Sequence, residues 1–321
     1  MSVLPASAEN IEKFADMISS GEAVAFPTET VYGLGVDAGN DEAVAKIFEL
    51  KGRPQFNPLI VHVRDLAQAE RLGVFSPLAR SLAKAHWPDA LTLVVPRSSD
   101  NPSHNEVSLL ASAGLPSLAL RVPAHPVAQE LLAAVQCPLA APSANKSGHL
   151  SPTQAAHVAK DFPNLPTLDG GVCSKGLEST IIGCLEDEPV LLRRGSLDAA
   201  ALEETLGHKL SYLAEDDSQT AQLAPGRLAR HYAPQAGLRL NAETVEQDEA
   251  LLAFGKDAPS CENLCLNLSP LGNLIEAAAN LFRHLHELDT TATRIAVMPI
   301  PNEGLGAAIN DRLERAAAAS K

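Results

Sequence analysis

Apolar residues recur along the first two thirds of the chain with two spacings, one typical of helices and one typical of short buried strands. In residues 7–20 they fall three and four positions apart behind a serine, which predicts a capped amphipathic helix. The same criteria predict helices at 7–20, 41–50, 77–86, 125–135, 153–160 and 198–206. They predict strands at 23–26, 58–63, 91–95, 118–122, 138–140, 179–183 and 190–192. This mixture of strands and helices indicates an α/β domain.

A polar stretch at 214–225 interrupts the pattern and is typical of a linker. Beyond it the alternation resumes, with predicted strands at 251–254, 263–268 and 295–299 and helices at 271–288 and from 304. We therefore predict three parts, namely a larger α/β domain at 1–208, a linker at 209–235 and a small C-terminal α/β domain at 236–321.

Charge and composition narrow the class of protein. The 321 residues include 25 Lys and Arg against 39 Asp and Glu, a formal net charge of −14. Sequence-independent binding of nucleic acid depends on clustered cations, and no run of Lys or Arg is present. No apolar run reaches the ~18 residues of a membrane helix, and the N-terminal residues lack a basic, apolar leader. We expect a cytoplasmic protein with no membrane contact and at most weak contact with tRNA.

The cysteines also favour a cytoplasmic protein. The chain has five cysteines with no pairing pattern, which indicates reduced, structural thiols. Cys261 and Cys265 lie four apart, but no second pair completes a zinc site. No metal site and no prosthetic group are predicted.

The common signatures of nucleotide-binding and hydrolytic enzymes are missing. The chain contains no G-x-x-x-x-G-K-[ST] phosphate loop, no G-x-G-x-x-G fingerprint, no G-x-S-x-G elbow and no H-E-x-x-H motif. Gly33 and Gly35 follow a predicted strand, and we expect this pair to form a turn. A standard hydrolase or zinc enzyme is therefore disfavoured.

Four polar segments stand out because each lies where a strand meets a loop. They are PTETVYGLG at 27–35, KGRP at 51–54, APSANKSGHLSPT at 141–153, and EST at 178–180 with RRG at 193–195. Each also has a simpler explanation. Lys51 and Arg53 can merely offset the negative end of a helix, and Ser143 and Asn145 are common turn residues. Together, however, these cations and hydroxyl donors suit a polyphosphate.

The order of these segments resembles that of the YrdC family. KGRP is followed by NPL and VH, and then come WP–LTLV, LALRVPAHP, APSAN-SG-SPT, DGG, ESTII and LLRRG. The lysine-x-arginine and serine-x-asparagine signatures are intact, and APGRLARHYAP and GLGAAINDRLERAA resemble the linker and terminal helix of the long, two-domain members. The resemblance implies a twisted mixed sheet with a large concave, positively charged cavity, and a smaller Rossmann-like α/β domain across it.

The family resemblance implies the activity of a threonylcarbamoyl-AMP synthase. Such an enzyme makes L-threonylcarbamoyl-adenylate and pyrophosphate from L-threonine, bicarbonate and ATP, with Mg²⁺ arriving on the ATP phosphates. The product would pass to a tRNA threonylcarbamoyl transferase, which modifies adenosine 37 of tRNAs that read codons starting with A.

The family pattern also implies roles for individual residues. Lys51 and Arg53 are expected to be catalytic, as a clamp on the triphosphate. The implied ATP site comprises Lys51, Arg53, Asn57, Ser117, Ser143, Asn145, Ser151, Arg193 and His231. The implied L-threonine site comprises Thr30, His62, Arg121, Ala141 and Ser179, with a bidentate contact from Arg121 to the substrate carboxylate. The segment 230–232 is expected to cross the cavity mouth as a lid.

Two other classes of function remain open from the sequence. An RNA-binding translation or ribosome-maturation factor would use a basic cavity, but the net charge of −14 weighs against it. A carbamoyl-transferring module like that of hydrogenase maturation factors is the other, although this chain lacks their acylphosphatase-like and zinc-finger segments.

Overall fold

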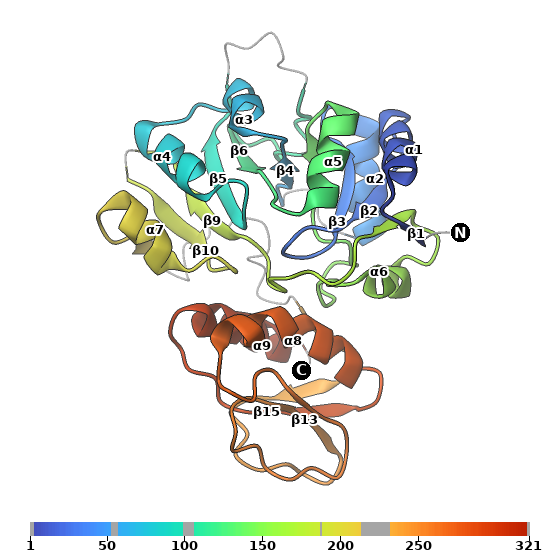
Figure 1. Ribbon diagram of the computed structural model, residues 1–321, viewed down its shortest axis with the longest axis vertical. Coiled ribbons are helices and arrows are strands. Elements are labelled where there is room, and N and C mark those ends of the chain that lie inside the picture. The colour runs from blue at the N-terminus through green and yellow to red at the C-terminus, as the bar shows by residue number, and fades with distance from the viewer. Residues whose placement is uncertain (1–2, 53–56, 99–105, 187, 213–231, 320–321) are drawn as a thin grey trace.

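The computed structural model describes residues 3–52, 57–98, 106–186, 188–212 and 232–319, and Figure 1 shows these residues as two α/β units. The first unit contains β1 (Val3–Pro5), α1 (Ala8–Ser19), β2 (Val24–Phe26), β3 (Gly33–Asp37), α2 (Asp41–Lys51), β4 (Ile60–His62), α3 (Leu66–Leu72), α4 (Pro77–His86), β5 (Leu91–Pro96), β6 (Ser117–Arg121), α5 (Pro126–Val135), β7 (Leu139–Ala140), α6 (Ala155–Asp161), β8 (Thr167–Asp169), β9 (Thr180–Gly183), β10 (Val190–Arg193), α7 (Ala199–Leu206) and β11 (Ser211–Tyr212). The second contains β12 (Gly237–Arg239), β13 (Glu249–Ala253), β14 (Cys265–Asn267), α8 (Leu274–Leu288), β15 (Arg294–Val297) and α9 (Leu305–Ala319).

The described strands form one sheet in each unit. The first sheet has eleven strands in the order β1-β8-β2-β3-β7-β4-β6-β5-β9-β10-β11. It is mixed, because β6 pairs parallel with β4 and antiparallel with β5. The second sheet has the order β12-β15-β13-β14, and all its pairs are parallel. The predicted fold class, a mixed-sheet α/β domain with a smaller α/β domain, is confirmed.

The predicted domain limits remain predictions. The strand β11 pairs parallel with β10 and so extends the first sheet into the predicted linker at 209–235. Residues 213–231 lie outside the described residues.

The helix α2 shows how local sequence brings a cation to the sheet. Asn40 caps its first turn, with Oδ1 accepting from the Ala43 N–H at 3.0 Å. At its other end Gly52 adopts a left-handed conformation with a φ of 59°, which favours glycine and stops the helix. Lys51 therefore lies in the last turn of α2, and its side chain is buried.

The glycine pair at 33 and 35 forms part of a strand, and the expectation of a turn there was wrong. Both residues lie in β3, which pairs antiparallel with β2. A Cβ at Gly35 would lie 2.6 Å from a ring carbon of Phe26, so the absence of a side chain lets this ring pack closely against the strand.

The small unit presents its helices to the large one. In Figure 1, α8 and α9 lie between the parallel sheet of the small unit and the loops below the large sheet. Gly176 comes so close to α8 that a Cβ there would lie 2.5 Å from the carbonyl oxygen of Ala279. Val31, Leu150 and Leu177 of the large unit belong to the same apolar cluster as the core of the small unit. The two units are thus packed through a shared core.

None of the described helices is long and apolar enough to cross a membrane.

Candidate active site

Three of the polar sequence segments meet at one place on the large sheet. The N–H of Leu34 donates to the carbonyl oxygen of Pro142 at 2.7 Å, and the N–H of Ala144 donates to that of Tyr32 at 2.8 Å. The N–H of Ser147 donates to the carbonyl oxygen of Lys51 at 2.8 Å. Backbone pairing therefore ties segment 27–35, the end of α2 and segment 141–153 into one wall.

A cavity lies against this wall. Among the described residues it is lined by Thr28, Thr30, Val31, Gly33, Ile60, His62, Arg121, Ala141, Pro142, Ser143, Glu178, Ser179, Arg193 and Tyr232. All five residues predicted to bind L-threonine are in this lining, although they come from five separate parts of the chain. Two of the residues predicted to bind ATP, Ser143 and Arg193, are also there. The cavity thus offers two guanidinium groups and several hydroxyls to an anionic ligand.

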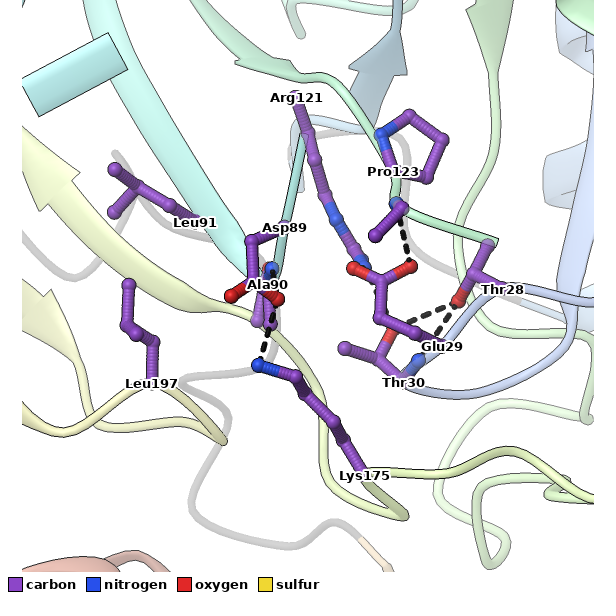
Figure 2. Close-up of polar contacts among 12 residues, drawn as sticks. Thr28, Glu29, Thr30, Asp89, Ala90, Leu91, Arg121, Pro123, Lys175 and Leu197 are labelled. Carbon is purple, nitrogen blue, oxygen red and sulfur yellow. Dashed lines mark hydrogen bonds and ion pairs between the residues drawn. The ribbon is translucent and has the colours of Figure 1, made fainter. Parts of the chain in front are cut away.

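Arg121 is held in the cavity by two neighbours, as Figure 2 shows. Its Nη1 donates to Thr30 Oγ1 at 2.9 Å, and its Nη2 donates to Glu29 Oε1 at 2.5 Å. The Glu29 carboxylate also accepts from the N–H of Ala124 at 3.0 Å. Among the described residues, no partner is seen for Arg121 Nε. The guanidinium is therefore oriented by protein contacts and still has a donor to offer.

His62 is neutral at the pH values at which proteins usually work. It lies at the end of β4, where its ring meets that of Phe26 edge-on at 6.1 Å. Burial, together with the charge of Arg121, lowers the pKa of His62 to about 3. A neutral imidazole can accept a hydrogen bond from a ligand.

Ser179 and Arg193 form a second polar corner of the cavity. Ser179 Oγ lies 2.7 Å from Thr92 Oγ1. The carbonyl oxygen of Ser179 accepts from Arg193 Nη2 at 2.9 Å. Burial lowers the pKa of the Arg193 guanidinium. The neighbouring Gly195 permits this corner, because a Cβ there would lie 2.4 Å from the carbonyl oxygen of Glu178.

Lys51 reaches the same wall from the end of α2. Its Nζ donates to the carbonyl oxygens of Ser143 and Asn145, each at 2.5 Å. Its ammonium group therefore lies beside the loop that carries the serine-x-asparagine signature, next to the cavity lining. The exposed fraction of Lys51 is only 4%, and its place in the last turn of α2 also fits the simpler explanation that it offsets the negative end of the helix.

Four other residues predicted to bind ATP are described and do not line the cavity. Asn145 donates from Nδ2 to the carbonyl oxygen of His149 at 2.9 Å, and Ser151 Oγ donates to Glu178 Oε1 at 2.5 Å. Asn57 is buried just before β4, and Ser117 is the first residue of β6, four positions before Arg121. Their roles in binding ATP stay predictions.

Two predicted residues, Arg53 and His231, lie outside the described residues. Of the proposed lid segment only Tyr232 is described. Its ring is almost fully buried, lines the cavity and lies 5.6 Å from the ring of Phe282 on α8.

Sequence reasoning missed two acidic residues of the site. Glu29 pairs with Arg121, and Glu178 lines the cavity and accepts from Ser151. Each belongs to a segment noted for its polar residues, and each is buried. An acidic side chain beside a buried apolar strand is a usable signal, because a buried carboxylate requires a partner.

Comparisons with known proteins agree with this geometry. Residues 16–195 match the Sua5/YciO/YrdC family model, described as "Telomere recombination", and residues 197–318 match the one described as "Threonylcarbamoyl-AMP synthase, C-terminal domain". Relatives named threonylcarbamoyl-AMP synthase from Bacillus subtilis and Pyrococcus abyssi are 37% and 38% identical. The alignments cover 96% and 94% of this chain, and 92% of each relative.

A solved structure extends the likeness to three dimensions. The crystal structure of P. abyssi Sua5 complexed with L-threonine matches with a TM-score of 0.87 at 37% identity, covering 98% of this chain and 96% of that one. The mixed-sheet domain with its cavity matches the first family model, and the small parallel-sheet domain matches the C-terminal model of a threonylcarbamoyl-AMP synthase. This chain belongs to the Sua5/YrdC family, in its long form.

Proposed function

We propose that this chain condenses L-threonine, bicarbonate and ATP into L-threonylcarbamoyl-adenylate and pyrophosphate. One observation carries the proposal: the five residues implied to bind threonine line a single cavity, which also contains Ser143 and Arg193. The likeness over the whole chain to a Sua5 protein crystallised with L-threonine supports threonine as the amino-acid substrate.

The residues of the cavity suit both ends of the amino acid. Arg121 has an N–H to donate to the substrate carboxylate, and Thr30 and Ser179 offer hydroxyls close to it. Neutral His62 can accept a hydrogen bond from the substrate amine or hydroxyl. Nη1 and Nη2 of Arg121 each carry a second N–H besides the one given to Thr30 or Glu29, so the expected bidentate contact can use these groups or Nε.

The chemistry requires two steps. The threonine amine takes up carbon dioxide from bicarbonate with loss of water, and a carbamate oxygen then attacks the α-phosphorus of ATP. The new oxygen–phosphorus bond replaces the bond to the β-phosphate, and pyrophosphate leaves. Since carbamates decompose in water, a cavity walled by buried side chains protects the intermediate. Lys51, Arg53 and Arg193 would balance the charge on the phosphates.

Magnesium is proposed to enter as part of the ATP substrate. The described residues contain no group of three or more His, Cys, Asp or Glu arranged to hold a metal ion, and ATP phosphates themselves bind Mg²⁺. We further propose that the adenylate is handed to a tRNA threonylcarbamoyl transferase, with at most weak contact between this chain and tRNA.

The test is pyrophosphate release from MgATP, with threonine and bicarbonate omitted in turn. Release that requires both substrates is the expected result. Release that does not depend on threonine would overturn the proposal and favour the RNA-binding alternative, to be examined as salt-dependent tRNA binding without ATP.

A further inference from the structure

A side chain from the small domain reaches the wall of the active site. Arg312 lies on α9, and its side chain is 1% exposed. Its Nε donates to Glu178 Oε2 at 3.1 Å, across the boundary between the two units. Glu178 lines the cavity and directly precedes Ser179. Among the described residues, the ion pair seen for this cavity carboxylate is with Arg312 of the C-terminal domain, and the charge of Arg193 in the same cavity also acts on it.

The contact extends to two other groups of the site. The second oxygen of Glu178 accepts from Ser151 Oγ at 2.5 Å, so the carboxylate joins Arg312 to a serine predicted to bind ATP. The guanidinium carbon of Arg312 also lies 5.4 Å from the centre of the Tyr232 ring, which lines the cavity. One buried cation therefore contacts both a carboxylate and an aromatic ring of the site.

A second helix of the small domain contacts Ser151. His286 on α8 lies with Nε2 3.2 Å from the carbonyl oxygen of Ser151. Ser151 itself is completely buried. Its backbone and its hydroxyl are thus fixed by two different helices of the C-terminal domain, one of them through Glu178.

We propose that Arg312 is a positioning residue for adenylate synthesis, which acts by balancing the charge of Glu178 and holding Ser151 and Tyr232 in place. The inference rests on the proposed function. A carboxylate in the wall of a cavity that takes ATP would repel the phosphates if it had no counter-ion. Arg312 removes that repulsion and directs the carboxylate toward Ser151.

The matched variants are Arg312→Met, which removes the charge and keeps much of the volume, and Arg315→Met. Arg315 lies on the same helix, bonds to Asp311 as Arg312 does, and is 25% exposed. With the full chain, we expect Arg312→Met to raise the KM for ATP at least tenfold and Arg315→Met to leave it within twofold.

Charge balance is tested by adding Glu178→Gln. If Arg312 acts through the charge of Glu178, the effect of Arg312→Met on the KM for ATP is at least fivefold smaller in the Glu178→Gln background than in the wild type. A purely structural role predicts something else. Loss of folded protein lowers the apparent kcat and the stoichiometry of threonine binding in calorimetry, but leaves KM unchanged.

Two results would overturn the inference. One is an Arg312→Met enzyme with the wild-type KM for ATP, and the other is an increase in KM that Glu178→Gln does not reduce. If Arg312→Met does not fold, the KM for ATP is compared between Arg312→Lys and the Arg312→Met/Glu178→Gln double variant. The double variant is used because it leaves no charge unpaired. A wild-type enzyme that releases no pyrophosphate in response to threonine would instead refute the proposed function.

Discussion

Arg121 and Glu29 form an ion pair of 2.5 Å, and each side chain is less than a tenth exposed. The pair joins the end of β6 to the loop before β3, which are 92 residues apart in the sequence. Because the Glu29 carboxylate also accepts from the backbone at Ala124, it fixes the direction in which the guanidinium faces the cavity.

Glu29→Gln is expected to weaken threonine binding. A hydrogen bond to a charged group contributes about 1.5–3 kcal/mol, so loss of the Arg121 anchor should raise the KM for threonine about tenfold or more. Steady-state kinetics at saturating ATP measure the effect. Glu70→Gln is the control, because Glu70 pairs with Arg80 at 2.6 Å on the exposed surface, where such pairs contribute about 0–1 kcal/mol. Equal KM values for the two variants would contradict the anchoring role.

Lys51→Ala is expected to abolish turnover while threonine still binds. Removing one preorganised electrostatic donor typically costs about 100- to 1,000-fold in rate, and we expect at least the lower figure for pyrophosphate release. Lys46→Ala is the matched control on the same helix, since Lys46 is exposed and donates to the carbonyl oxygen of Gly21. Turnover of Lys51→Ala within threefold of the wild type would rule out its place in the phosphate clamp.

Two stacked histidines are expected to make the free energy of unfolding depend on pH. The rings of His157 on α6 and His286 on α8 lie 3.9 Å apart. Burial lowers the pKa of His157 to about 3 and that of His286 to about 4. The unfolded chain therefore binds more protons than the folded one below the ordinary histidine pKa of ~6.5. Stability is complete above about pH 6.5 and falls as the pH drops toward 4, by up to ~1.4 kcal/mol per pH unit for each ring.

Denaturant unfolding between pH 4.5 and 7.5 measures this slope. The His157→Gln/His286→Gln double variant should have a shallower pH dependence than the wild type, and His208→Gln, at an exposed position, should not differ from it. An unchanged slope in the double variant would show that other groups set the acid sensitivity.

Tyr232→Ala is expected to impair both folding and ATP binding. Truncation of a buried aromatic ring costs about 3–5 kcal/mol, and this ring packs on Phe282 while it lines the cavity. Tyr212→Ala is the control, because Tyr212 is 51% exposed at the edge of the sheet. Thermal unfolding and the KM for ATP are measured together. If removing 222–235 leaves ATP affinity and turnover unchanged, the proposed lid is wrong.

Much of this architecture follows from local pattern, and the failures have physical causes. Helices such as α1 and α4 were predicted to within a residue or two at each end, because capping serines and apolar spacing mark them. The strands β1 and β8 were missed, since neither lies in a run of consecutive apolar residues like the one that marks β2. The strand β3 was missed because its glycines accommodate the Phe26 ring, a contact the sequence does not show.

The site divides in the same way. The five residues implied to bind L-threonine were predicted because an ordered set of motifs carries them. The structure places all five in the lining of one cavity. The roles of Glu29, Glu178 and Arg312 could not be predicted, because each depends on an ion-pair partner 92 or more residues away. Side-chain pairing over such distances is a property of the folded chain.

The link between Glu178 and Arg312 also concerns the order in which the protein is made. The two residues are separated by 134 positions, so the strands around the cavity leave the ribosome long before α9 does. Until then Val31, Leu150 and Leu177 lack their apolar contacts with the small unit, and Glu178 lacks its ion pair with Arg312. A growing chain thus gains the contact between Arg312 and the cavity wall only after α9 has been synthesised.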